Sequence, residues 1–341
     1  PGKRGFMQKT ITTFLLTCLL INFGHAAVMQ IKVIYGEDNR VDAENYMNKK
    51  FVELATATAA RVANYDLVEL NSEQYVLGEI TLEERGICKS ERFSQQPTTA
   101  SCSGFLVAKN ILVTAGHCMT SEFDCSEQSW VFDYKVDHND QSEVVVDKSN
   151  VYKCKSIISQ KLDNTTENDY AVIELESEVI DREPLKWRTE GVPSVGDQLV
   201  VIGHPSGLPT KIADGARVRE VNDVFMVANL DTYGGNSGSA VFNLKTGLVE
   251  GILVRGENDY VFDSDQKCSV SNRVLDTEGR GEDVTLIASV DGLPEITVPE
   301  EPEPTEPEDP TPEPDEPTSN DDLNFIQRFF RWLGNLFRSI F

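Results

Sequence analysis

Three short segments of the chain carry residues that together could perform nucleophilic catalysis. His117 lies in Thr-Ala-Gly-His-Cys, Asp169 begins Asp-Tyr-Ala-Val-Ile, and Ser237 lies in Gly-Gly-Asn-Ser-Gly-Ser. An imidazole can take the proton of a serine hydroxyl, while a carboxylate fixes the imidazole tautomer. The amides of Gly235 and Ser237 could bind the oxyanion of a tetrahedral intermediate. The segments predict a His–Asp–Ser triad, with Asp163 as the alternative carboxylate, although no apolar run follows it.

The elements that must position these residues are short β-rich runs separated by turns. Examples lie at 104–107, 111–113, 130–132, 198–202 and 248–254. Runs of this length and spacing are typical of an all-β barrel or sandwich. The stretch from 73 to 298 is too long for one small barrel and suits two packed barrels. The preceding segment, 28–72, is expected to be a mixed N-terminal segment or propeptide, helical over 44–62.

The order His, Asp, Ser and the surrounding motifs resemble the chymotrypsin-like (trypsin-like) serine protease family. Val-Ile-Tyr at 33–35, His-Pro-Ser-Gly-Leu-Pro at 204–209 and Gly-Gly-Asn-Ser at 234–237 are similar to its bacterial glutamyl-endopeptidase branch. The resemblance covers roughly 30–298. It implies two packed six-stranded antiparallel β-barrels, secretion, and a serine endopeptidase that acts on protein or peptide substrates.

The resemblance also implies a substrate-binding set of Asp231, Arg255 and Gly256. Asp231 stands six residues before Ser237, where trypsin-like enzymes carry a pocket-floor aspartate, which predicts cleavage after Arg or Lys. Glutamyl endopeptidases have a histidine where this chain has Leu253. Two alternatives stay open: Asp231 caps a turn or pairs with Arg255, or Arg255 binds an acidic substrate residue in a glutamate-preferring enzyme.

Asn236 stands directly before the serine, in the position where vertebrate-type zymogens have an aspartate. That aspartate captures a newly formed N-terminal amine in an ion pair. An asparagine has no charge to offer, so we expect that activation switch to be absent.

The cysteines predict disulfides and not a metal site. Seven are present, and Cys18 lies in the expected signal peptide. An even set of six in an exported chain suggests three bridges. The family resemblance implies Cys102–Cys118, and the remaining four allow three connectivities. Among these we expect Cys125–Cys154 and Cys88–Cys268, because this choice keeps one bridge inside the first barrel. No zinc-like spacing occurs, and we expect neither a metal nor another cofactor.

The N-terminal 27 residues have the pattern of a signal peptide, with 1–6 as an upstream extension. A lysine precedes a short apolar run, which ends near the small residues Gly-His-Ala-Ala. This pattern predicts export, so the protein is expected to be secreted or periplasmic, with association with the cell envelope as an open alternative. The net charge of −25 argues against nucleic acid as a partner, because phosphates would be repelled.

The C-terminal segments differ from the rest of the chain. Residues 299–320 are rich in proline and acidic residues, which predicts an extended linker. Residues 321–341 place apolar residues on one helical half and arginines on the other, which predicts an amphipathic helix. We expect this helix to contact a membrane surface. The alternative is that it packs on a barrel of the same chain.

The sequence as a whole predicts an exported serine endopeptidase. Two rival hypotheses belong to other classes of protein. The chain could be a catalytically silent, protease-like binding module, or an adhesion protein in which the tail matters more than the barrels. The presence of all three triad residues argues against the first rival, because a binding scaffold has no need of them.

Overall fold

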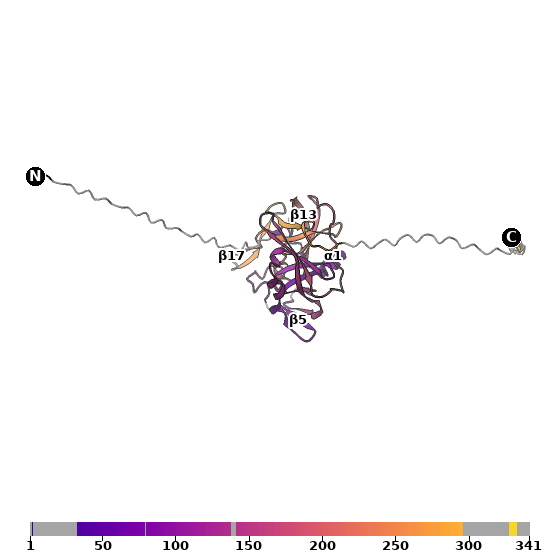
Figure 1. Ribbon diagram of the computed structural model, residues 1–341, viewed down its shortest axis with the longest axis horizontal. Helices are drawn as coiled ribbons and strands as arrows, with labels where there is room; N and C mark the ends of the chain where they lie inside the picture. Colours follow the sequence, from indigo (N-terminus) through magenta and orange to yellow (C-terminus); the bar gives the residue numbers. More distant parts are fainter. Residues whose placement is uncertain (1, 3–32, 79, 138–140, 296–326, 333–341) are drawn as a thin grey trace. The chain divides into compact units, whose positions relative to one another are not determined.

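The computed structural model describes residues 2, 33–78, 80–137, 141–295 and 327–332. The chain divides into two units, Pro1–Pro294 and Glu295–Phe341. The expected signal peptide, the linker at 299–320 and most of the expected C-terminal helix lie outside the described residues. The first unit contains both barrels and all the candidate site residues (Figure 1).

The first barrel is closed by six strands in the order β10-β11-β7-β6-β3-β8. Their bounds are β3 (Thr58–Ala63), β6 (Cys102–Ala108), β7 (Ile111–Thr114), β8 (Gln128–Phe132), β10 (Val151–Asp163) and β11 (Asn168–Leu175). All the pairings are antiparallel. Closure leaves this sheet without an unpaired edge.

The second barrel follows the first in sequence and is also antiparallel. Its strands are β12 (Gln198–Gly203), β13 (Lys211–Val221), β14 (Phe225–Ala228), β15 (Ala240–Asn243), β16 (Val249–Arg255) and β20 (Glu282–Leu286). The order is β12-β15-β16-β20-β14-β13, and pairing of β12 with β13 closes the ring. The predicted pair of six-stranded barrels is therefore confirmed.

Strand β12 of the second barrel buries both of its faces. Leu199 and Val201 pack in the cluster that fills this barrel, whereas Val200 and Ile202 belong to the larger cluster that includes first-barrel residues. Successive side chains of a strand point to opposite faces. A continuous apolar run therefore supplies the barrel core and the contact between the barrels.

The N-terminal segment is part of the two-barrel unit, and this corrects the boundary expected at residue 73. β3 is a strand of the first barrel, and β2 (Arg40–Asp42) pairs with β13 in the second. β1 (Ile34–Tyr35) pairs in parallel with β19 (Arg273–Val274). The described residues from 33 onward thus cannot be a separable propeptide.

The helix expected over 44–62 is also corrected. Helix α1 spans only Lys49–Ala55, and Asn48 caps its N-terminus by accepting a hydrogen bond from the amide of Lys50. Residues 58–63 form β3 because they pair with β6 and β8 on both sides. Here tertiary pairing overrides the helical pattern of the local sequence.

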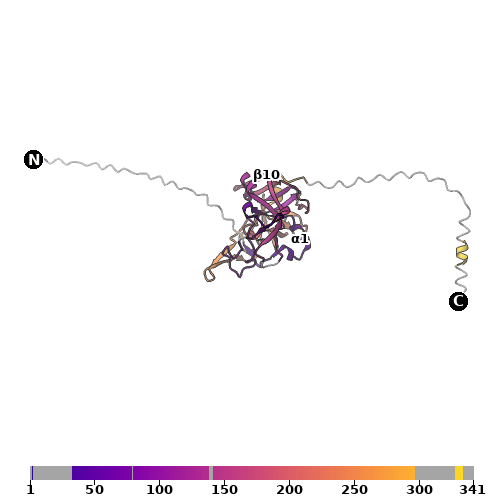
Figure 2. The same ribbon diagram turned by 90° about the horizontal axis from the view of Figure 1, so that it is seen from below.

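Smaller elements surround the barrels. A three-stranded sheet contains β4 (Val68–Glu69), β5 (Gln74–Leu77) and β9 (Val144–Asp147), and β17 (Tyr260–Asp263) pairs with β18 (Cys268–Ser271) in a hairpin that projects from the domain (Figures 1 and 2). Helix α2 spans Glu122–Glu127. Short 3-10 helices are η1 (Ala43–Asn45), η2 (Asn64–Asp66), η3 (Gly116–Cys118), η4 (Lys148–Asn150), η5 (Pro205–Gly207) and η6 (Ile287–Ser289).

All three expected disulfides are present in the structure. Cys102 is bonded to Cys118, Cys125 to Cys154, and Cys88 to Cys268. The bridge from Cys88 joins two segments 180 residues apart in sequence. The choice among the three possible connectivities is therefore confirmed.

The described part of the second unit is a helical stretch, 327–332. Its aromatic side chains are exposed, with Phe329 at 49%, Phe330 at 67% and Trp332 at 60%. Within the described ranges, no helix has both the length and the apolar character needed to cross a bilayer.

Candidate active site

His117 lies in η3, directly after β7. β7 pairs with β11 in the first barrel, so the residues that follow β7 lie beside the start of β11. Gly116 makes this turn possible, because a Cβ at this position would collide with the carbonyl of Lys161. The turn therefore presents the imidazole to the first residues of β11.

Asp169 of β11 binds His117 through both of its carboxylate oxygens. The main-chain amide of His117 donates to Oδ1 at 3.0 Å, and the ring Nδ1 lies 2.7 Å from Oδ2. Asp169 is almost fully buried, and its main-chain carbonyl accepts a hydrogen bond from Thr285 at 3.1 Å. A carboxylate only accepts, so Nδ1 carries a proton, and in the neutral ring Nε2 is then the nitrogen with a free lone pair.

Asp163, the alternative carboxylate, lies at the other end of the turn between β10 and β11. It accepts hydrogen bonds from Thr165 and Thr166 in that turn. The structure therefore brings Asp169, and not Asp163, to His117.

Ser237 lies in the loop between β14 and β15, and the first barrel holds this loop in place. Ser103 of β6 donates its amide to the carbonyl of Ser237 and its hydroxyl to the carbonyl of Gly235, both at 2.8 Å. From the second barrel, the amide of Gly238 bonds to the carbonyl of Leu253 in β16. The loop is thus fixed where the two barrels meet.

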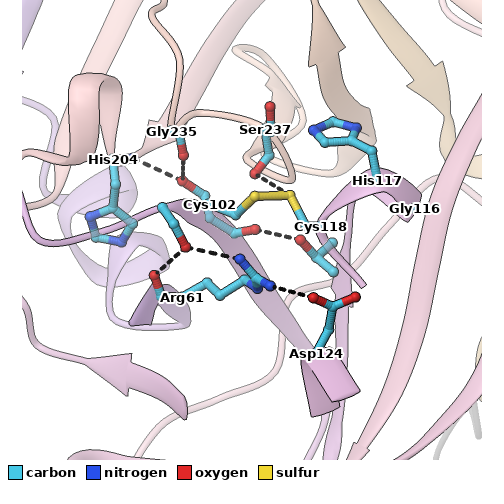
Figure 3. Close-up of a disulfide and its surroundings, with 12 residues drawn as sticks. Arg61, Cys102, Gly116, His117, Cys118, Asp124, His204, Gly235 and Ser237 are labelled. Atoms are coloured by element: carbon cyan, nitrogen blue, oxygen red, sulfur yellow. Dashed lines mark hydrogen bonds and ion pairs between the residues drawn. A yellow bond between two sulfur atoms is a disulfide. The ribbon is translucent and has the colours of Figure 1, made fainter. Parts of the chain in front are cut away.

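The Cys102–Cys118 disulfide lies under both His117 and Ser237. The Sγ of Cys118 is 3.8 Å from the carbonyl oxygen of Ser237, and the imidazole has a nitrogen within 4.8 Å of both sulfurs. In Figure 3 the side chains of His117 and Ser237 lie on the same side of the disulfide. The disulfide therefore ties the loop of His117 to the strand that also holds the Ser237 loop. Because both sulfurs are used in this bond, the trio of Cys102, His117 and Cys118 is not a thiolate metal site.

The backbone around Gly235, one of the two expected oxyanion-site amides, has a conformation that favours glycine. The carbonyl of Gly234 accepts from the amide of Ser206 at 2.5 Å. Carbonyl and amide of one trans peptide point in opposite directions, so the amide of Gly235 points away from Ser206. Gly235 has φ of +94°, and a Cβ would lie 2.5 Å from the carbonyl oxygen of His204. Glycine is required here on both counts.

Asn236 uses its side chain inside the same loop. Its Oδ1 accepts a hydrogen bond from the hydroxyl of Ser239 at 3.1 Å. The loop conformation is thus stabilised by neutral groups of the loop itself.

Asp231, the expected pocket-floor residue, uses both of its carboxylate oxygens to bind main-chain amides of the N-terminal segment. Its Oδ1 accepts from the amide of Tyr35 at 2.8 Å and its Oδ2 from the amide of Asn39 at 2.9 Å. Burial raises the pKa of Asp231 to about 7, although both amide hydrogen bonds act in the opposite direction. Asp231 therefore attaches the N-terminal segment to the loop that leads to Ser237.

Arg255 is also committed to other groups. Its Nε donates to Asp283 at 2.8 Å, and its Nη2 donates to the carbonyl of Glu167 at 3.0 Å. Asp283 is buried and also binds Arg280. Arg255 therefore pairs with Asp283 and not with Asp231, which was one of the two alternatives, and both its Nε and its Nη2 are used within the fold.

Gly256, the third expected pocket residue, lies against a buried carboxylate. A Cβ on Gly256 would collide with both oxygens of Glu282. Glu282 is fully buried and accepts hydrogen bonds from the hydroxyl of Thr232 at 2.8 Å and the amide of Glu257 at 3.2 Å. An acidic group thus lies next to Gly256, but it comes from β20.

Two residues that matter to the geometry were not identified from the sequence. Ser103 holds the Ser237 loop, and His204 is fully buried beneath it, with Nδ1 3.1 Å from the carbonyl of Leu208. Burial lowers the pKa of His204 to about 3. A serine next to a cysteine does not indicate that Ser103 would bind the Ser237 loop. The His-Pro-Ser-Gly motif indicated a family resemblance but no structural role for His204.

Comparison with known proteins identifies the domain that contains this site. Residues 102–252 match the family model of the trypsin-like peptidase domain, and this span includes His117, Asp169 and Ser237. No curated protein matches the chain. A solved Glu endopeptidase, in complex with MPD, is 17% identical over 75% of this chain and 95% of its own, with a TM-score of 0.41. The inactive serine-to-alanine mutant of Rv3671c from M. tuberculosis is 12% identical over 76% of this chain and 94% of its own, also with a TM-score of 0.41.

Proposed function

Residues 102–252 match the family model of the trypsin-like peptidase domain, and from this premise we propose that the chain is a serine endopeptidase with His117, Asp169 and Ser237 as its triad. The proposal is supported chiefly by the two hydrogen bonds between His117 and Asp169, because they place the proton of a neutral imidazole on Nδ1 and leave the lone pair of Nε2 for use as a base. The fixed loop around Ser237, with its oriented Gly235 amide, agrees with the same role.

The reaction proceeds through an acyl-enzyme. Ser237 Oγ bonds to the substrate carbonyl carbon while His117 Nε2 takes the hydroxyl proton. The oxyanion lies against the amides of Gly235 and Ser237, and Asp169 stabilises the imidazolium. The carbon–nitrogen bond then breaks as His117 passes its proton to the leaving amine. Water, deprotonated by His117, attacks the ester and releases the acid and Ser237.

A fluorophosphonate probe tests this mechanism directly. It should label the wild-type protein at Ser237, and Ser237→Ala should abolish both labelling and peptide hydrolysis. His117→Ala should lower kcat by about four orders of magnitude or more, and the double variant should be no worse than either single one. Normal hydrolysis by a folded Ser237→Ala protein would overturn the proposal, and a silent wild-type protein would favour a binding module.

We further propose that cleavage follows Arg or Lys, with Glu282 in place of Asp231 as the acidic determinant. Support comes from the contact between the Glu282 carboxylate and Gly256, at the end of the strand expected to line the acyl-side pocket. Glu282→Gln should weaken cleavage after basic residues, whereas Asp231→Asn should leave that preference intact. A peptide library that shows cleavage after glutamate would instead support the glutamate-preferring alternative.

Export to an oxidising compartment is the proposed setting for this activity. Three disulfides in a domain of this size fit a secreted or periplasmic protein better than a cytosolic one. Fractionation of producing cells, with N-terminal sequencing of the mature protein, tests this. Recovery of an unprocessed chain in the cytoplasm with free thiols would contradict it.

A further inference from the structure

A cavity of about 470 Å³ opens beside the loop that carries Ser237. Gly234 and Gly235 form one side of it, and Ser101, which directly precedes β6, forms another. The remaining walls come from the segment around Arg85 and from Tyr260 at the start of β17. The triad and the proposed acyl-side residues Gly256 and Glu282 do not line it.

The outer walls of this cavity are fixed to each other. The Cys88–Cys268 disulfide joins the segment around Arg85 to the β17–β18 hairpin. Ser269 adds two main-chain hydrogen bonds, at 2.9 Å to the amide of Cys88 and 2.9 Å to the carbonyl of Gly86. The hydroxyl of Tyr260 lies 2.7 Å from the hydroxyl of Ser206. The cavity is therefore a built feature of the fold.

The position of the cavity indicates which half of a substrate would reach it. The leaving amine receives its proton from His117, so the leaving segment must lie beside this imidazole. The imidazole in turn lies close to the Cys102–Cys118 disulfide, so the leaving segment passes near that disulfide. Ser101 is adjacent to Cys102 of that disulfide and lines the cavity. Under the proposed function, the acyl half lies toward Gly256, the expected acyl-side residue, which does not line the cavity. The cavity thus lies on the leaving-group side.

Two charged residues line the cavity, and they differ in their contacts. Asp259 accepts the amide of Gly234 at 2.9 Å, so its carboxylate is bound to the Ser237 loop. Arg85 donates Nη1 to the carbonyl of Ser206 at 3.1 Å, which uses one of its five N–H groups. Across the described part of the chain, no carboxylate lies within ion-pair distance of Arg85. Such a guanidinium suits a carboxylate ligand.

We infer that this cavity is a leaving-group-side subsite in which Arg85 binds an acidic residue of the substrate polypeptide. The inference rests on the proposed endopeptidase function and adds a second determinant of substrate choice to it. Substrates would then carry an Asp or Glu within the first residues after the scissile bond.

The test compares peptides that are identical except for Glu or Gln at each of the first three positions after the cut. For the wild-type protein, kcat/KM should be about fivefold higher with Glu at one of these positions. Arg85→Ala should bring this ratio close to one. Lys89→Ala removes an equal charge from an exposed position of the same segment and should leave the ratio unchanged. A Glu/Gln ratio of one in the wild type, or a ratio that survives in Arg85→Ala, would refute the inference.

A binding measurement separates this inference from the hydrolysis proposal. The same peptides are titrated into Ser237→Ala by fluorescence anisotropy, with and without Arg85→Ala. Tighter binding of the Glu peptide that depends on Arg85 supports the subsite even if the wild type cleaves nothing. Equal binding of Glu and Gln peptides overturns it even if hydrolysis is rapid. Tighter binding of a Lys peptide that is lost in Asp259→Asn would also overturn it.

Discussion

The substitution Asp169→Asn provides a stringent test of the proposed chemistry, because the structure dictates how the asparagine must lie. The main-chain amide of His117 can only donate, and it lies 3.0 Å from Oδ1. Asparagine must therefore place its oxygen there, which puts its NH₂ group 2.7 Å from Nδ1. Two donors cannot face each other, so the ring proton moves to Nε2. In that tautomer His117 cannot accept the proton of Ser237.

The expected loss in kcat is about 10⁴-fold, the usual effect of forcing the wrong tautomer in such a triad. This corresponds to about 5 kcal/mol of transition-state stabilisation. Because Asn has nearly the same shape as Asp, KM and the thermal unfolding midpoint should change little. The assay is steady-state hydrolysis of a peptide that the wild type cleaves, with Asp163→Asn as the matched control and expected to be fully active. If Asp169→Asn kept a tenth or more of the wild-type kcat, or Asp163→Asn lost activity, the assignment of roles would be wrong.

Three further predictions concern stability and the tail. Burial holds the pKa of His204 near 3, below the unfolded value of 6.5, so the unfolded state binds more protons between these values and stability falls as pH drops below 6.5. Between pH 7 and pH 4, the free energy of unfolding measured in urea should fall by about 3 kcal/mol less in His204→Gln than in the wild type. Equal decreases in the two proteins would contradict the explanation. Replacing Cys88 and Cys268 by Ala should cost up to about 5 kcal/mol of unfolding free energy, more than removing the Cys125–Cys154 bridge, because the closed loop is longer; the reverse ranking in urea would disprove the loop-length argument. The full chain should float with anionic liposomes, and a chain ending at Ser319 should not; a full chain that remained in the soluble fraction would rule out membrane contact by the exposed aromatic residues.

Local sequence patterns predicted the barrels because strands buried on both faces have a distinctive appearance. The apolar runs at 104–107 and 198–202 lie in strands, and the run at 248–254 lies in β16 from Val249 onward. The Cys102–Cys118 bridge came from the family resemblance, and the other two bridges were chosen from three connectivities that the sequence alone does not distinguish. The stretch at 58–63 could not be predicted, because its strand state depends on β6 and β8, which come later in the chain.

In the candidate site too, some residues could be predicted from the sequence and others could not. Each triad residue lies in a local motif, and a motif can be read from the sequence. The groups that a carboxylate binds cannot be predicted from a local motif, because they can come from distant parts of the sequence. The offset of Asp231 from Ser237 suggested a pocket floor, but the amides that it binds belong to Tyr35 and Asn39, almost two hundred residues earlier. Likewise Arg255 meets Asp283 only because β16 and β20 are neighbours.

The N-terminal segment, which contributes to both barrels, also constrains how the protein can be made. The ribosome releases residues 34–63 before the rest of the two-barrel domain, yet β2 cannot pair until β13 is made, and β1 cannot pair until β19 is made, near the end of the domain. Folding therefore requires contacts between distant parts of the sequence, which is slow and leaves strand edges unpaired during synthesis. Neither barrel can be excised at a single linear boundary, because each would lose part of its own sheet or leave a strand of the other behind. A fragment that keeps all of these strand pairings must therefore include the whole domain from residue 33 to residue 294.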